Sequence, residues 1–185
     1  GSDAAPNSTA ALFLTATADP ALARRVGESP GALSALAAAV ATNAYGTAKN
    51  CAGALASVAE ADPRLAQRVA QVPGALLALV AAVAAGGDAA MSGAQALATI
   101  AEADPGLALR VAEVPGALFT LVAAVATNAG GAAGNCAAAL GRIAKANPQL
   151  AQRVAVVPEA MPVLYAAVPA VGSLAGYSTS AVLYL

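Results

Sequence analysis

The chain has 185 residues, a formal net charge of −1 and no histidine, and only 10 % of its residues are charged. A nucleic-acid surface needs clustered lysine and arginine, so this charge balance argues against a nucleic-acid partner. Alanine makes up close to a third of the residues, and this composition strongly favours helix.

The apolar fraction of 59 % raises the question of a membrane protein, because the run from Val114 to Gly141 carries no formal charge. A spanning helix needs about 20 predominantly apolar residues. Pro115-Gly116 and residues 128–131 interrupt this run, and much of it is weakly hydrophobic alanine. We therefore expect no membrane insertion.

Residues 1–18 are expected to hold a tag scar and the last helix of a partial repeat. Gly1-Ser2, without a starting methionine, looks like the remnant of a cleaved tag. The helix is indicated by a recurring interval of 13 residues between an asparagine and a proline. This interval occurs at Asn7 and Pro20, at Asn50 and Pro63, and at Asn135 and Pro148.

Two series of prolines share one period, with intervals of 43, 42 and 43 residues. The first series is Pro20, Pro63, Pro105 and Pro148, and the second is Pro30, Pro73, Pro115 and Pro158. Self-similarity at such a period is typical of a solenoid, in which each unit buries its apolar face against its neighbours. The predicted units are residues 19–61, 62–103 and 104–146, followed by a divergent or truncated unit at 147–185.

Each unit begins with Asp-Pro or Asn-Pro, as at Asp62-Pro63 and Asn147-Pro148. A short acceptor side chain at the N-cap followed by proline at the first helical position starts a helix. The second proline of each unit is predicted to start a second helix, whose apolar residues have the spacing of a buried stripe. In the first unit we expect helices near residues 20–27, 30–41 and 47–61.

The third helix carries the most repetitive segment. Asn50-Cys51-Ala52-Gly53-Ala54-Leu55 returns as Asn135-Cys136-Ala137-Ala138-Ala139-Leu140, and more loosely as residues 92–97. Helical spacing places Cys51 and Leu55 on one face and Gly53 on a neighbouring face. We expect Leu55 and its equivalents Leu97 and Leu140 to be buried. Three helices in about 42 residues predict an all-α, right-handed superhelical solenoid of armadillo-like three-helix repeats.

The last unit departs from the pattern, because Pro162 and Pro169 intrude and residues 172–176 lengthen the loop before its third helix. Ser178 stands where Asn135 would fall. This unit is either an atypical terminal cap or part of a longer array.

The sequence resembles the armadillo repeat family at this point. The family's third helix commonly reads N-A-A-x-A-L-x-N-L-A, which residues 50–55 and 135–140 follow closely, and residues 73–83 resemble its second-helix segment G-x-I-P-x-L-V-x-L-L. The resemblance implies a protein-binding scaffold. Members that hold extended peptides use ladders of tryptophan and asparagine on the third helix, and both ladders are missing here. The tryptophan positions are Gly53, Gln95 and Ala138, and the asparagine positions are Ser57, Thr99 and Arg142.

We expect a protein or peptide partner on this concave third-helix surface. Small residues at the tryptophan positions predict a shallow surface that is poor in charge, bound mainly through apolar contact and a few hydrogen bonds. Asn50 and Asn135 would either contact the partner's backbone or cap local loop carbonyls. The predicted partner-binding residues are Asn50, Gly53, Ser57, Ser92, Gln95, Thr99, Asn135, Ala138 and Arg142.

One arginine recurs at the end of every first helix, as Arg25, Arg68, Arg110 and Arg153. The structural interpretation places each guanidinium near an aspartate or a carbonyl of an adjoining unit. The alternative is an anion-binding strip, which the recurring Asp19, Asp62 and Asp104 would neutralise.

Cys51 and Cys136 are the only cysteines and occupy equivalent positions two units apart. Two helix-packing steps of about 8–10 Å place the thiols beyond disulfide reach, so we expect reduced core thiols, which favour an intracellular protein while leaving the compartment open. The ligand count excludes a metal site. No nucleophile stands beside a base and no phosphate-type glycine loop occurs, so we expect neither catalysis nor a cofactor.

Two functions remain open from the sequence. The first is a non-catalytic scaffold that binds another protein on the third-helix surface. The second is a structural element that stacks or self-associates through exposed solenoid ends, within a longer array or a larger assembly.

Overall fold

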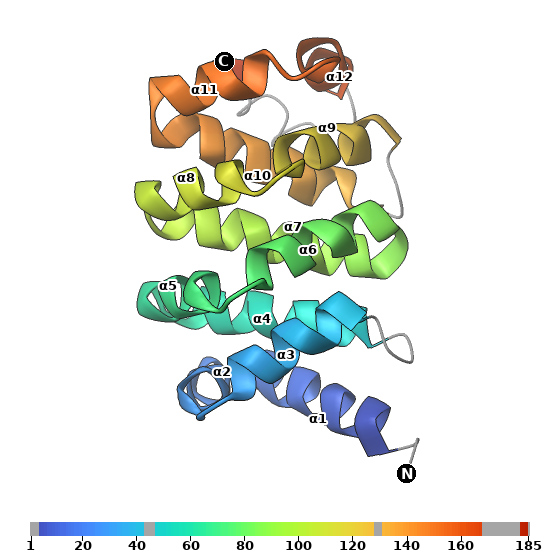
Figure 1. Cartoon of the computed structure of the whole chain (residues 1–185), viewed down its shortest axis with the longest axis vertical. Coiled ribbons are helices and arrows are strands. Elements are labelled where there is room, and N and C mark those ends of the chain that lie inside the picture. Colours follow the sequence, from blue (N-terminus) through green and yellow to red (C-terminus); the bar gives the residue numbers. More distant parts are fainter. Residues whose placement is uncertain (1–3, 43–46, 128–130, 168–181, 185) are drawn as a thin grey trace.

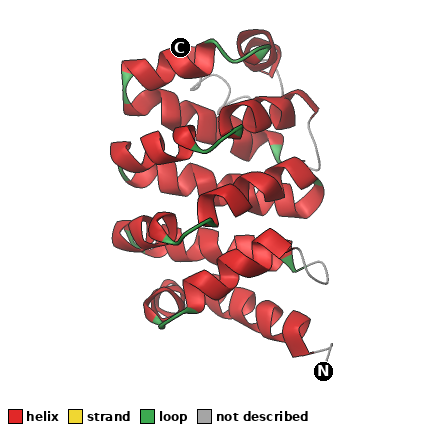
Figure 2. Cartoon of the chain, in the orientation of Figure 1, coloured by secondary structure: helices red, strands yellow, loops and turns green. Residues whose placement is uncertain are grey.

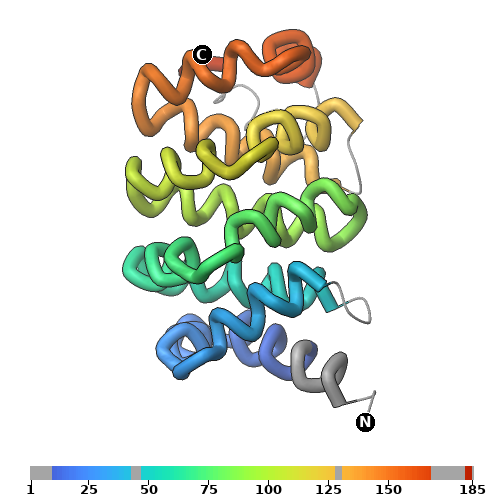
Figure 3. Tube along the Cα trace, viewed as in Figure 1, coloured from blue at the N-terminus to red at the C-terminus, as the bar shows by residue number. Residues whose placement is uncertain are grey.

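The structure is a computed structural model that describes residues 4–42, 47–127, 131–167 and 182–184, with side chains described from residue 10 onward. Within these ranges the regular elements are all helices and no strand occurs (Figure 2). The units follow one another along the long axis of the molecule, from α1 at one end to α12 at the other (Figures 1 and 3). The predicted all-α solenoid of three-helix repeats is confirmed.

The helices fall into three series. The first helices are α2 (Pro20–Glu28), α5 (Pro63–Gln71), α8 (Pro105–Glu113) and α11 (Pro148–Ala155). The second helices are α3 (Ala32–Thr42), α6 (Ala75–Ala85), α9 (Ala117–Thr127) and α12 (Ala160–Ala167). The third helices are α1 (Ala4–Ala18), α4 (Ala48–Ala61), α7 (Gly87–Ala103) and α10 (Ala133–Ala146). Residues 168–181, and with them the predicted position of Ser178, lie outside the described residues.

Each first helix begins at its proline, as predicted. The residue before the proline is the N-cap, and its side-chain oxygen accepts a hydrogen bond from a backbone N–H of the first turn. The bond is 2.8 Å long from Arg64 N–H to Asp62 Oδ1 and 2.9 Å from Leu150 N–H to Asn147 Oδ1. These caps satisfy donors that the helix itself leaves unpaired, and so fix where each unit starts.

The second helices begin two residues later than predicted. Pro73-Gly74 forms a turn rather than the start of α6, because Gly74 has a φ of +77°, which a right-handed helix does not contain. Gly31 and Gly116 have a φ of +76° at the equivalent positions. This turn sets α5 and α6 at 89° and α8 and α9 at 85° to one another.

The last unit places a non-glycine residue at this turn. Glu159 has a φ of +64°, in the left-handed region that costs a side-chain-bearing residue about 1 kcal/mol. The last unit therefore keeps the left-handed turn of the other units, and its departure from the pattern lies in the glutamate that replaces glycine there and in its inserted prolines.

The core runs without interruption along the stack. α4 packs against α1 on one side and against α7 on the other, and α7 in turn packs against α10. Leu55, Leu97 and Leu140 are fully buried, which confirms the prediction for this face. Small residues let the backbones approach: a Cβ atom on Gly93 would lie 2.9 Å from the carbonyl oxygen of Leu79. Alanine and glycine therefore both supply close packing, and alanine also supplies helix propensity.

No helix in the described part of the chain is by itself long and apolar enough to cross a membrane. Two pairs of consecutive helices, α5 with α6 and α8 with α9, would together be long and apolar enough to cross a membrane, judged by length and composition only. Each pair is sharply bent.

Two members of the arginine series bond to the preceding unit. Arg110 Nη2 donates to the Ala70 carbonyl oxygen at 2.8 Å, and Arg153 Nη2 donates to the Ala112 carbonyl oxygen at 2.9 Å. Both acceptors lie in the last turn of a first helix, where carbonyl groups lack a partner within the helix. The structural interpretation is confirmed for these two arginines, whereas Arg68 makes no such bond to the described residues.

The substitution Leu97→Ala should destabilise the protein by about 2–5 kcal/mol, because it removes a fully buried side chain in the middle of the stack and leaves a cavity. Urea denaturation followed by circular dichroism measures the loss. The matched control is Leu77→Ala, on an exposed leucine of α6, which should change the unfolding free energy far less. Equal effects of the two substitutions would contradict this description of the core.

The substitution Arg110→Met should lower the unfolding free energy by about 1 kcal/mol, because it keeps most of the apolar stem and removes the bond to the Ala70 carbonyl. Arg68→Met removes the equivalent charge without removing such a bond. Thermal unfolding of both variants separates the two effects, and equal losses would show that charge rather than the hydrogen bond matters.

Candidate functional site

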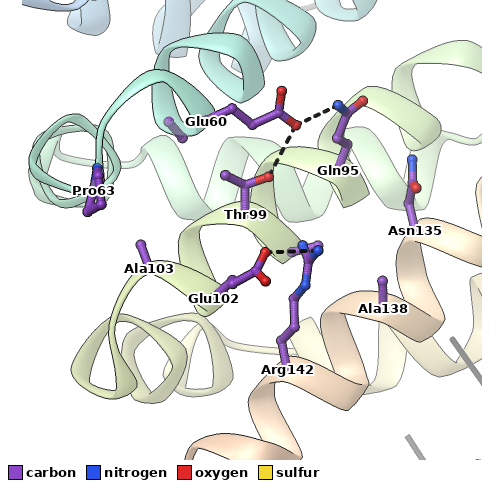
Figure 4. Close-up of a pocket in the computed structure, with 11 residues that line it drawn as sticks. Glu60, Pro63, Gln95, Thr99, Glu102, Ala103, Asn135, Ala138 and Arg142 are labelled. Carbon is purple, nitrogen blue, oxygen red and sulfur yellow. Dashed lines mark hydrogen bonds and ion pairs between the residues drawn. The ribbon is translucent and has the colours of Figure 1, made fainter. Parts of the chain in front are cut away.

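The third helices form a hollow that crosses three successive units. Its volume is about 460 Å³, and α4, α7 and α10 all contribute to it. We name this hollow, together with the neighbouring one described next, the third-helix groove. The lining of the first hollow is Ala59, Glu60, Pro63, Gln95, Ala98, Thr99, Glu102, Ala103, Asn135, Ala138 and Arg142 (Figure 4).

The groove contains six of the nine predicted partner-binding residues. Five of them line the first hollow, and Ser57 lines the neighbouring hollow of about 480 Å³ together with Thr17. Glu60 lines both hollows and joins them. The five in the first hollow are Gln95, Thr99, Asn135, Ala138 and Arg142.

Two predicted contact residues are buried in the packing instead, and a third lies outside the groove. A Cβ atom on Gly53 would lie 2.5 Å from the Phe13 ring, because this aromatic side chain of α1 packs directly against α4. Ser92 is only 8 % exposed within α7. Asn50 is half-buried and lines neither hollow. Helical spacing placed these residues on one face correctly, but the neighbouring unit covers part of that face.

Glu60 lies in the groove although it is not among the predicted residues. Its Oε1 atom accepts a hydrogen bond of 2.8 Å from Gln95 Nε2 and one of 3.5 Å from Thr99 Oγ1, so a carboxylate of α4 is held by α7 (Figure 4). The signal was present, because Glu60 follows Ser57 by three residues and so shares its face of the helix.

Glu102 occupies the position equivalent to Glu60 in the next unit, and its partner is different. Arg142 Nη2 of α10 lies 2.9 Å from Glu102 Oε2, and the side chains are 30 % and 63 % exposed respectively (Figure 4). A partly exposed ion pair contributes about 1 kcal/mol or less to stability. Its consequence for the groove is that a carboxylate and a guanidinium neutralise each other across two units.

The expectation of a surface poor in charge is therefore wrong. Glu60, Glu102 and Arg142 all line the first hollow. The error has a physical cause: the two glutamates share the helix face of the ladder positions but lie one turn beyond them, near the end of their helices.

Asn135 lines the first hollow and also makes a contact that neither sequence interpretation described. Its Nδ2 atom donates a hydrogen bond of 3.1 Å to the Met91 carbonyl oxygen of α7. This asparagine thus caps a backbone carbonyl, and the carbonyl belongs to the preceding third helix rather than to a local loop.

Both cysteines are free and buried. Burial raises the pKa of the Cys136 thiol to about 12 and also raises the pKa of the Cys51 thiol, which a hydrogen bond with Thr47 partly offsets. A thiol reacts as its thiolate, so both side chains are inert at neutral pH and serve as small core residues.

Comparisons with known proteins support the fold. No protein-family model and no curated protein matches the chain. A designed armadillo repeat protein superimposes with a TM-score of 0.86 at 24 % identity, covering 97 % of this chain and 75 % of its own length. A structure of computationally designed armadillo repeat proteins for modular peptide recognition gives a TM-score of 0.87 at 23 % identity. The match covers 98 % of this chain and 75 % of that structure's chain.

A further designed armadillo repeat protein, solved in complex with the peptide (KR)4, gives a TM-score of 0.84 at 21 % identity, covering 96 % of this chain and 74 % of its own length. At such identities the similarity establishes the fold, and the chain therefore has an armadillo-like repeat fold.

Native Cys51 and Cys136 should react with a thiol reagent such as Ellman's reagent at pH 8 only as fast as the protein opens, because both thiols are buried and protonated. The rate should rise by orders of magnitude in denaturant. Rapid labelling of the folded protein would contradict their placement in the core.

The same shifts predict a pH dependence of stability. Burial raises the pKa of the Cys136 thiol to about 12 in the folded protein, above that of an exposed thiol. Its contribution to stability is therefore fully present below about pH 9 and is lost as the pH rises from 9 toward 12. The substitution Cys136→Ala should remove part of this pH dependence, as measured by denaturation at several pH values.

Proposed function

We propose that this armadillo-like solenoid is a non-catalytic scaffold that binds a protein or peptide partner along the third-helix groove. The observation that carries the proposal is the hollow of about 460 Å³ to which third helices of three successive units contribute. A ligand lying along the solenoid axis would contact each unit in turn. The designed relatives for modular peptide recognition, and the one in complex with (KR)4, support a partner of this kind.

The lining of the groove suits a polypeptide partner. Ala59, Ala98 and Ala138 form small apolar parts of the lining, over which a partner's backbone can approach closely. Gln95 and Thr99 add an amide and a hydroxyl group, which donate and accept hydrogen bonds. An interface that combines apolar contact with a limited number of hydrogen bonds is typical of protein recognition.

The polar groups of the groove support a role in binding. Glu60 is held by Gln95 and Thr99, and Glu102 is held by Arg142. The proposed role uses these side chains for recognition, where fixed hydrogen-bonding positions provide the register of the partner.

One observation favours the second candidate function, end-to-end association of copies. Tyr165 of α12 is 56 % exposed, whereas its equivalents Val80 and Val122 are 5 % and 3 % exposed in the interior units. Exposed apolar surface at the end of a stack favours association with another stack. Light scattering over a concentration series distinguishes this candidate from partner binding by a monomer.

Replacing Gln95 and Thr99 together with glutamate, and separately with lysine, should weaken or redirect partner capture. The glutamate pair adds two negative charges beside Glu60, and the lysine pair adds two positive charges, so the two variants should affect capture in opposite directions or abolish it. Capture is measured with a peptide library displayed on phage, alongside thermal unfolding.

The matched controls place the same charges on exposed positions of α5, as Gln67→Glu with Gln71→Glu and as the corresponding lysine pair. These should leave capture unchanged. If capture by the folded groove variants equals capture by the controls for both signs of charge, the third-helix groove is not the binding surface.

A further inference from the structure

We propose that Arg142 sets the charge selectivity of the third-helix groove. By holding Glu102 it leaves Glu60 as the carboxylate available to a cation, so the groove accepts a partner segment with one cationic side chain and disfavours a segment with several. This inference rests on the proposed function and adds the chemistry of the partner.

The first step is the difference between the two glutamates. They are equivalent in the repeat and both line the first hollow, yet their hydrogen-bonding partners differ in charge. Glu60 accepts hydrogen bonds from the neutral groups of Gln95 and Thr99, so its negative charge is not compensated by them. Glu102 lies 2.9 Å from the guanidinium of Arg142, so its charge is compensated within the protein. Only one of the two carboxylates therefore retains a net attraction for a cation.

The second step is the position of Arg142 in the repeat. The equivalent residues of the preceding units are Thr99 and Ser57, which are short and uncharged. Arg142 is long enough to reach from α10 to Glu102 on α7, and it remains partly exposed in the hollow. The charge in the groove thus changes from negative near Glu60 to neutral near Glu102. Lys145, which stands where the earlier units have Glu60 and Glu102, adds a positive charge on the far side of this pair.

The third step is the spacing of side chains in an extended peptide. Alternate residues point to the same side and lie about 7 Å apart. If one lysine of such a peptide contacts Glu60, the next lysine on that side lies farther along the same hollow, toward Arg142. The Debye length at physiological ionic strength is about 8 Å, so the repulsion from the guanidinium is only partly screened at this range.

The experiment uses the full chain and three octapeptides. One contains only alanine and glutamine, one contains a single lysine among them, and one has four lysines alternating with alanine. Backbone amide NMR titrations to millimolar peptide concentration measure affinity and show whether Gln95 and Thr99 report the binding. The Arg142 Nε–H signal reports whether its pairing with Glu102 persists.

In the wild-type protein, the single-lysine peptide should shift the Gln95 and Thr99 signals, and the neutral peptide should bind at least about threefold more weakly. The substitution Arg142→Gln should increase the affinity for the four-lysine peptide by roughly tenfold, since it frees a carboxylate and removes a repulsive charge. The affinity for the single-lysine peptide should change by less than about twofold, because its contact is at Glu60.

Two further variants separate the local effect from net charge. Arg68→Gln makes the same charge change on an exposed arginine of α5 outside the groove and should leave the four-lysine affinity within about twofold of wild type. Adding Glu102→Gln to Arg142→Gln should remove most of the gain. Thermal unfolding of each variant verifies that the fold is retained.

The inference is overturned if Arg142→Gln leaves the four-lysine affinity unchanged, if Arg68→Gln raises it equally, or if the neutral and single-lysine peptides bind alike. If a peptide still shifts the amide signals of Gln95 and Thr99 in these cases, the proposed function is retained and only the charge selectivity is wrong. If no peptide shifts these signals in any variant at millimolar concentration, the proposed binding surface fails together with its selectivity.

Discussion

The close stacking of the third helices is the constraint on which the rest of the structure depends. α7 packs between α4 and α10, and small side chains allow this approach: Ala54, Ala96 and Ala139 are fully buried at equivalent positions. A unit of three short helices cannot bury its apolar face alone, so each unit depends on its neighbours. The same stacking determines which side chains of the third helix remain exposed, and these line the groove.

Polar contacts between units occur at two levels of the stack. Arginines of the first helices satisfy carbonyl groups at the end of the preceding first helix, as Arg110 does for Ala70. On the third helices, Glu60 and Glu102 reach side chains of the following unit. The first level completes the hydrogen bonding of helix ends, where an unsatisfied group is costly. The second level lies in the groove and is accessible to a partner.

The absence of the tryptophan and asparagine ladders has a structural counterpart in this chain. Gly53, at a tryptophan position, makes room for Phe13, and Arg142, at an asparagine position, pairs with Glu102 of α7. Residues at the ladder positions thus serve partly to join units. The recognition that we propose uses the residues around Glu60 and Arg142, where the charge differs from one unit to the next. This variation gives equivalent positions of the repeat different chemistry.

The sequence by itself determined the elements that depend on local interactions. Asp62-Pro63 fixes a helix start through a side-chain cap two residues away, and the period of the prolines fixes the order of the units, so both were predictable from residues close together in the chain. Helical spacing predicted six of the residues that line the groove. Only the tertiary structure decided which third-helix residues stay exposed: Gly53 and Ser92 are covered by packing, whereas Glu60 and Glu102 turn into the groove. The pairing of Arg142 with Glu102 joins residues 40 positions apart, and such contacts depend on the superhelical placement of whole units, which no local pattern specifies.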